Sequence, residues 1–261
     1  MRPATLSSME RGLAEHRRDW DDLAVLDPLW AIASRPGSRH GRWDDEEFMA
    51  SGRRKVATIR RTLDGLDAPV RFGRALDFGC GVGRLTLPLA DHFEEAVGID
   101  VAPSMVAQAE ARAVAAGRAD VRFVLDDGAD LAALGDEPFD LVFTALVLQH
   151  LPSRRDVERC VRGLARLVAP DGVLMAQMPA RLAPWARVQP ARRAYGVLRR
   201  VGVPPGVLYR RLCLQPMRLL AVPRSRFESL LEAEGLRVET VDARQHRAML
   251  SCTYVARRPA T

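Results

Sequence analysis

The stretch RALDFGCGVGRLT, residues 74–86, decides the fold of this chain. A short apolar strand runs into three alternating glycines, Gly79, Gly81 and Gly83, and a helix is predicted to begin near Arg84. Glycine lacks a Cβ, so such a loop can take positive φ angles and let a ligand lie against the main chain. The free N–H groups at the start of the helix would point to the same place. The stretch therefore predicts a cofactor-binding loop.

Acidic residues end the strands on both sides of this loop. Asp77 lies at the end of the strand before the glycines, where its carboxylate could meet the ammonium group of a ligand. Asp100 ends a second strand, AVGID, and an acid at that place can accept hydrogen bonds from ribose hydroxyls. The glycine spacing departs from the Gly-x-Gly-x-x-Gly of dinucleotide-binding loops, so the rest of the chain has to identify the ligand.

Three more strand-like segments follow in order: VRFVL at 121–125, FDLVFTAL at 139–146 and VLMAQMP at 173–179. Pro103 at a first helical position and a capping box of Ser153 with Asp156 mark helices between them. Because these strands are apolar without strict polar alternation, they predict a mostly parallel sheet covered by helices on both faces. Ligands of such sheets bind beyond the carboxyl ends of the strands, where the glycines and acids lie.

The ordered set LDFGCGVG, GID, LDDGADL, FDLVFTALVLQHL and APDGVL resembles the class I S-adenosylmethionine-dependent methyltransferases of the small-molecule type. The resemblance covers residues 70–258. It implies an α/β fold with a Rossmann-like seven-stranded sheet, mostly parallel, with helices on both faces and an antiparallel last strand. The segments DPLWAI, WDDEEFMASG and SCTYVARR look like a bacterial branch often linked with glycan and natural-product modification.

The resemblance implies S-adenosylmethionine as the cofactor and assigns residues to its methionine end. It places Gly79, Gly81 and Gly83 under the methionine and ribose portion, Asp77 near the amino group and Arg84 near the carboxylate. For Gly79, a role in helix–strand packing alone stays open.

For the nucleoside end, the resemblance assigns the ribose hydroxyls to Asp100 and the adenine amine to Asp127. It implies that Val101 and Gly128 line the adenine. Asp126, in place of Asp127, could face the base.

Three zones are predicted along the chain: a helical N-terminal lid (1–70), a cofactor-binding core (71–179 and 225–261) and a helical insert after the fifth strand (180–224). In the lid, one helix runs from Ser7 to about Leu26 and a second is capped by Asp44. After the insert, Ser225 and Glu228 form a capping box for a helix that precedes two closing strands. The lid and insert are expected to form the acceptor pocket.

The insert is a local field of positive charge, since no acid lies between Asp171 and Glu228. Its six prolines predict short helices and turns. Two arginine pairs are candidates for binding an anionic group of the acceptor: Arg192 with Arg193, and Arg210 with Arg211. A solvated arginine-rich face is the alternative.

His150 is the candidate catalytic base, because it follows the fourth strand on the loop that edges the methyl group. Methyl transfer mainly requires alignment and exclusion of water, without a metal, and a base is needed only when the acceptor loses a proton. Alternatively, His150 binds a backbone carbonyl and positions its loop. His40 could reach the site only if the N-terminal loop closes, and His16 has no supporting pattern.

Trp43 and Phe48 could roof the cofactor and acceptor, since aromatic rings exclude water and attract a sulfonium. The alternative is that they anchor the N-terminal segment to the core.

The composition of the 261 residues, 48% of them hydrophobic, allows one full-sized core. The four cysteines make no C-x-x-C pair, so neither a zinc site nor a disulfide framework is indicated. The N-terminal residues lack the apolar run of a secretory signal, so a cytoplasmic protein is expected. The net charge of +6 comes almost wholly from arginine, with Lys55 the sole lysine, and the oligomeric state is left open.

The leading hypothesis is therefore O-methylation of a small-molecule acceptor, such as a sugar, glycan or secondary metabolite. RNA methylation by way of the arginine-rich insert is a second reading. Nucleic acid is not favoured, because the fourth strand ends in TALV (144–147) instead of the N/D-P-P-aromatic pattern of base-amine methyltransferases. A non-catalytic subunit that binds the cofactor is the third reading.

Overall fold

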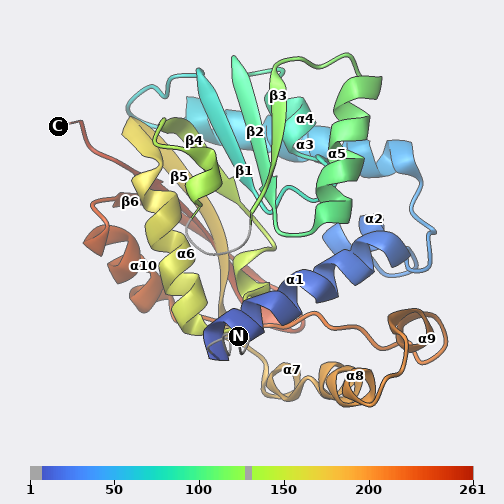
Figure 1. The fold of residues 1–261 in the computed structure, drawn as a ribbon. Coiled ribbons are helices and arrows are strands. Elements are labelled where there is room, and N and C mark those ends of the chain that lie inside the picture. The colour runs from blue at the N-terminus through green and yellow to red at the C-terminus, as the bar shows by residue number, and fades with distance from the viewer. Residues whose placement is uncertain (1–7, 127–130, 261) are drawn as a thin grey trace, which may run out of the picture.

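The computed structural model describes residues 8–126 and 131–260 and has a seven-stranded sheet with helices on both faces (Figure 1). The strands are β1 (Arg74–Phe78), β2 (Glu95–Asp100), β3 (Val121–Leu125), β4 (Phe139–Thr144), β5 (Val168–Leu182), β6 (Arg237–Gln245) and β7 (Met249–Arg257). Their order is β3-β2-β1-β4-β5-β7-β6. Strands β1 to β5 pair in parallel, and β7 runs antiparallel to both neighbours. The predicted fold class, including the antiparallel last strand, is confirmed.

The two faces of the sheet are covered by different helices. On one face, α3 (Asp45–Asp64) and the single turn α4 (Thr86–Leu89) pack Val56, Ile59 and Leu89 against the strands. On the other, α6 (Arg154–Arg166) and α10 (Arg224–Ala233) contribute Val161 and Phe227. Helix α5 (Pro103–Ala115) covers the β2–β3 end of the sheet.

The predicted helix starts at Asp44, Pro103 and Ser153 are confirmed. The side chains of Asp44 and Ser153 cap their helices, because each accepts a hydrogen bond from the backbone amide three residues further along the chain. The capping box predicted at Ser225 is wrong. Helix α10 begins at Arg224 with Pro223 as its N-cap, and Glu228 instead pairs with Arg224 one turn away.

The helix predicted to begin near Arg84 starts two residues later, at Thr86, and is only one turn long. The reason is the backbone of the loop: Gly79, Gly81 and Gly83 all have positive φ angles, so the chain is still turning at residue 84. The amide groups that face the ligand site are therefore those of the loop rather than those of a long helix.

Helices from the N-terminal segment and from the insert after β5 lie beyond the carboxyl ends of the parallel strands (Figure 1). We call them the cap: α1 (Ser8–Leu26), α2 (Pro28–Ile32), α7 (Pro184–Val188), α8 (Pro190–Arg200) and α9 (Pro205–Arg210). In the insert, α7, α8 and α9 each begin with a proline, whose fixed φ suits a first helical position.

Asp27, buried between α1 and α2, joins the two parts of the cap. Its Oδ2 accepts hydrogen bonds from the amides of His40 (2.6 Å) and Gly41 (3.1 Å) and from the Tyr209 hydroxyl (2.6 Å). The Arg39 guanidinium donates to the carbonyl oxygens of Tyr209, Cys213 and Leu214 nearby. The N-terminal segment and the insert are thus bound to each other as well as to the core.

Helix α3 approaches the glycine loop so closely that only glycine fits at one position. A Cβ on Gly52 would lie 2.1 Å from the carbonyl oxygen of Arg84. We therefore expect Gly52→Ala to lower the free energy of unfolding by about 1–3 kcal/mol, because α3 or the loop must move. Urea unfolding measures this change.

Gly196→Ala is the matched control, since Gly196 also lies inside a helix but a Cβ there would meet nothing within 4 Å. This substitution should stabilise the protein by about 0.5–1 kcal/mol through helix propensity. An equal increase in the free energy of unfolding for both variants would show that α3 does not pack closely against the glycine loop.

Candidate active site

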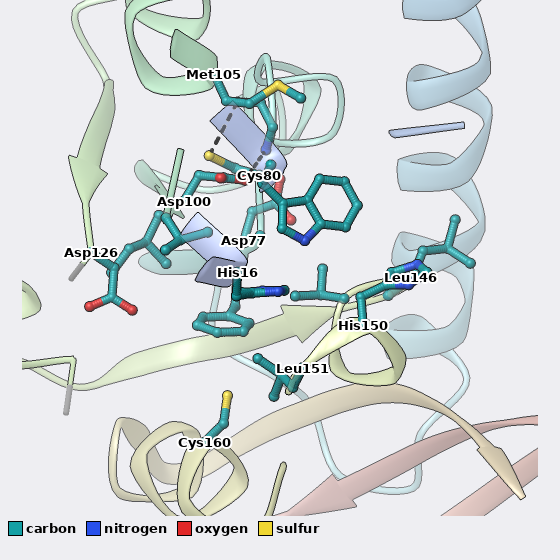
Figure 2. A pocket seen from close by; sticks show the side chains of 18 of the residues that line it. His16, Asp77, Cys80, Asp100, Met105, Asp126, Leu146, His150, Leu151 and Cys160 are labelled. Carbon is teal, nitrogen blue, oxygen red and sulfur yellow. Dashed lines mark hydrogen bonds between the residues drawn. The ribbon is translucent and has the colours of Figure 1, made fainter. Parts of the chain in front are cut away.

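A cavity opens at the carboxyl ends of the parallel strands, between the glycine loop and α1 (Figure 2). Its walls come from the loops after β1, β2, β3 and β4, from α6 and from the cap. The lining residues predicted from the sequence are Asp77, Gly79, Gly81, Arg84, Asp100, Val101 and His150. Further lining residues include Leu13, His16, Trp20, Ile32, Met105, Asp126 and Leu146.

The Asp100 carboxylate fixes the glycine loop in place. Its Oδ2 accepts a hydrogen bond from the amide of Gly81 at 2.8 Å, and its Oδ1 accepts from the amide of Ala102 at 3.0 Å. Burial raises the pKa of Asp100, while these backbone bonds favour its ionised form. Each carboxylate oxygen can still accept a second bond, so the side chain can bind hydroxyl groups of a ligand.

The glycines of the loop allow close approaches by other segments. A Cβ on Gly79 (φ +76°) would lie 2.3 Å from Cγ2 of Val147, and one on Gly81 (φ +54°) would lie 2.4 Å from Cδ1 of Ile32 in α2. Because Gly79 and Gly81 have no Cβ, the loop after β4 and helix α2 of the cap can pack directly against the glycine loop at the cavity. Gly83 lies behind the loop, where a Cβ would meet the Phe123 ring of β3.

Asp77 and Arg84 bring opposite charges to the same wall of the cavity. Asp77 is buried and accepts a 2.7 Å hydrogen bond from the Thr86 hydroxyl, and burial raises its pKa to about 6. Arg84 donates to the Ser51 hydroxyl at 3.2 Å, but its buried Nε has no hydrogen-bond partner. A zwitterionic amino-acid group fits such a pair, because an acid and a cation with an unused donor both face it.

The far end of the cavity is lined by Val101, Met105 and Asp126, and Asp126 is buried. The amide of Asp126 donates to the carbonyl oxygen of Asp100 at 2.9 Å, so the two acids follow neighbouring strand ends. Asp127 and Gly128, which the resemblance assigned to the adenine, lie outside the described residues.

His150 lies at the cavity wall in a fixed orientation (Figure 2). Its Nδ1 donates to the carbonyl oxygen of Arg218 at 2.5 Å, and its Nε2 accepts from the side-chain amide of Gln149 at 3.1 Å. Burial lowers its pKa to about 4. The imidazole is therefore neutral near pH 7 and carries its lone pair on Nε2.

An aromatic group from α1 completes this wall. The Trp20 ring meets His150 edge-on at 5.4 Å between centroids, and the His16 and Trp20 rings also meet edge-on, at 6.1 Å. Burial lowers the pKa of His16 to about 3, with His150 and Arg218 adding to the shift. Sequence reasoning missed both residues, although Leu13, His16 and Trp20 share one helical face.

Trp43 does not line this cavity. Its Nε1 donates to the carbonyl oxygen of Ala33 at 2.9 Å, and its ring packs on Phe48 and under the Arg35 guanidinium. His40 also lies away from the cavity, with its ring against Tyr209. Both residues hold the N-terminal segment together.

The two arginine pairs predicted to bind the acceptor, Arg192 with Arg193 and Arg210 with Arg211, do not line the cavity either. Arg193, Arg210 and Arg211 are exposed on the outer side of the cap. Arg192 is half-buried, and the charges that act on it include Asp19 and Glu15 of α1. Within the described residues, no group of three or more histidines, cysteines and acids could hold a metal ion.

Comparison with known proteins finds methyltransferases named for small molecules and for 23S rRNA. Residues 76–176 match the protein-family model described as a methyltransferase domain. The chain is 32% identical over 202 residues to a trans-aconitate 2-methyltransferase of Methylobacterium nodulans, covering 76% of this chain and 70% of that protein. It is 36% identical over 155 residues to 27-O-demethylrifamycin SV methyltransferase of Amycolatopsis mediterranei, covering 58% of this chain and only 52% of the relative.

Among solved structures, magnesium protoporphyrin IX methyltransferase from Synechocystis PCC 6803 with bound SAH has a TM-score of 0.60. The sequences are 20% identical, and the match covers 95% of this chain and 99% of that one. This likeness concerns the fold.

The raised pKa of Asp77 predicts how stability changes with pH. The folded state holds the proton up to about pH 6, whereas an unfolded chain releases it near pH 3.9. Ionisation of Asp77 therefore costs stability progressively as the pH rises through this window. We expect Asp77→Asn to stabilise the ligand-free protein at pH 7 by on the order of 2 kcal/mol, with the gain vanishing toward pH 4.

Urea unfolding at several pH values measures this gain, with the exposed Asp67→Asn as the control for loss of an acid. A gain that stays constant between pH 4 and 7 would contradict the assignment.

Proposed function

This chain belongs to the class I S-adenosylmethionine-dependent methyltransferases, and on that premise we propose that it methylates an oxygen atom of a small, mostly apolar molecule. The observation that carries the proposal is the continuity of the cavity. One wall offers the glycine loop and its acids, and another offers neutral imidazoles, an indole and leucines, while α6 adds Asp156, Arg159 and Arg166 to the lining.

The residues at the loop fit S-adenosylmethionine, which supplies an electrophilic methyl group when bound. Arg84 Nε, buried without a partner, would bind the carboxylate of the methionine portion, and Asp77 its ammonium. Asp100 would accept from the ribose hydroxyls while it keeps its bonds to the loop. Val101 and Asp126 would face the adenine, and the same role is proposed for Asp127 and Gly128.

The acceptor would occupy the part of the cavity near Trp20. Leu13, Leu146 and Leu151 line the cavity together with His16, Trp20 and His150, and both imidazoles are neutral near pH 7. An uncharged ring or chain gains from burial against such walls, whereas an anion would lose its hydration there. This supports a secondary metabolite over a sugar or an anionic acceptor held by the insert arginines.

His150 would orient the acceptor hydroxyl and take up its proton. The Arg218 carbonyl fixes Nδ1 as the donor, so Nε2 presents the lone pair. The hydroxyl would replace the Gln149 amide at Nε2, and Gln149 has a side-chain oxygen without a partner that could accept in its turn. Because the pKa of His150 is about 4, the proton would pass on readily to solvent.

A carboxylate acceptor is the second candidate, favoured by the likeness to a trans-aconitate methyltransferase. A carboxylate needs no base, so this alternative leaves His150 without a proton to accept. Phenols, alicyclic alcohols and carboxylic acids, each incubated with S-adenosylmethionine and analysed by mass spectrometry, distinguish the two. Methylation of alcohols or phenols supports the proposal, and methylation of acids alone contradicts it.

Cofactor binding tests the role of Asp100. We expect Asp100→Ala to weaken binding of S-adenosylhomocysteine at least tenfold in calorimetry, about 1.4 kcal/mol or more, because ribose hydroxyls lose a charged acceptor. Asp100→Asn keeps one acceptor for the loop amides and should lose less. The exposed Asp67→Ala should bind as the parent does, and unchanged affinity in Asp100→Ala would refute the assignment.

Turnover tests the role of His150. We expect His150→Ala to lose about 10²-fold or more in turnover of a hydroxyl acceptor, while its affinity for S-adenosylhomocysteine changes less than twofold. The activity of the parent should be flat near neutral pH and fall as the pH drops toward about 4, because the imidazolium cannot accept a proton. A variant that keeps near-normal turnover and the same pH profile would exclude His150 as the base.

A further inference from the structure

The insert carries an unusual share of the exposed apolar side chains. Of the nine large hydrophobic residues exposed in the described chain, five belong to it: Trp185, Val188, Val197, Val201 and Leu212. Trp185 is 60% exposed and Val201 72%. Helices α7, α8 and α9 lie side by side on the outer side of α1 (Figure 1), so these residues lie on a layer that the core does not cover.

Helix α8 has two distinct faces. One face turns toward α1: Tyr195 is buried, and Arg199 pairs with Asp22 at 3.2 Å. Arg193, Val197 and Val201 recur at intervals of four residues on the other face, and all three are exposed. Val197 and Val201 on the outer face therefore take no part in the packing of α8 against α1.

The exposed apolar residues are interleaved with unpaired cations. Within the described residues, five exposed arginines of α7, α8, α9 and the C-cap of α9 form no ion pair: Arg187, Arg193, Arg200, Arg210 and Arg211. No acid lies between Asp171 and Glu228 to neutralise them along the chain. We call these five arginines and the five apolar residues the insert surface.

We propose that the insert surface binds the protein to an anionic lipid bilayer. Short helices with arginines among exposed tryptophan, valine and leucine suit the interface of a membrane, where the apolar groups enter the acyl boundary and the cations meet the headgroups. None of the described helices has the length and apolarity to cross a bilayer, so the contact is with its surface. The proposal does not depend on which acceptor the enzyme methylates.

The apolar residues favour a bilayer over RNA as the partner. Binding of RNA phosphates requires only the arginines, and it would leave Val188, Val197 and Val201 exposed to water. A bilayer uses both kinds of side chain at once.

Sedimentation of the full chain with vesicles tests the proposal. We expect binding to vesicles of phosphatidylcholine with about 30% phosphatidylglycerol, at least tenfold weaker binding to pure phosphatidylcholine, and weakening as salt is raised. The emission of Trp185, the most exposed indole, should shift to the blue on binding. Trp185→Phe should remove most of that shift.

Paired variants separate the two contributions. Val197→Ser with Val201→Ser, and Arg193→Glu with Arg200→Glu, should each weaken vesicle binding at least tenfold while leaving urea unfolding unchanged. The matched controls lie away from the insert: Val114→Ser on α5, 81% exposed, and the exposed Arg71→Glu before β1. Both should bind within twofold of the parent.

Three outcomes would overturn the proposal. The parent fails to bind anionic vesicles at low salt, or the two double variants bind them as the parent does. The third is retention of the chain on a polyuridine oligonucleotide, with no binding to vesicles, which would assign the insert surface to nucleic acid.

Discussion

The Asp100 carboxylate joins the end of β2 to the glycine loop and to Ala102, the N-cap of α5. Two main-chain amides converge on this one side chain, and the loop also donates from Gly79 to the carbonyl oxygen of Ile99. The loop is therefore held open for a ligand by contacts with β2. Ordering a loop with three glycines costs much conformational entropy, and these hydrogen bonds offset that cost.

The cavity also holds charge that the protein does not neutralise by itself. Asp77 is buried and Arg84 is half-buried at one wall, and desolvation disfavours the charged form of each. A ligand that carries both an ammonium and a carboxylate would satisfy the two side chains together. On the proposed assignment, the cost of burying them in the free protein would become selectivity for a zwitterion, because a ligand lacking either charge would leave one group unpaired.

Local signals explain what the sequence could predict. The parallel part of the sheet follows from apolar strands that alternate with helices, and the acids at strand ends follow from the same pattern, since Asp77 and Asp100 both line the cavity. The cap could not be derived in this way. Leu13, His16 and Trp20 have the spacing of any buried helix face, and a run of arginines looks the same whether it points into a cavity or into solvent. Sequence reasoning therefore placed Trp43 and the insert arginines at the acceptor, whereas Trp20 and His16 line the cavity.

The hydrogen bonds of Asp27 with His40, Gly41 and Tyr209 make the two halves of the cap interdependent. A chimera that receives the insert of a relative without the matching N-terminal segment could lose the Tyr209 hydrogen bond and leave the buried Asp27 carboxylate with the amides of His40 and Gly41 alone. Acceptor preference should therefore transfer between relatives only when both segments are exchanged together. In evolution, the two should likewise diversify as one unit, although more than 140 residues separate them along the chain.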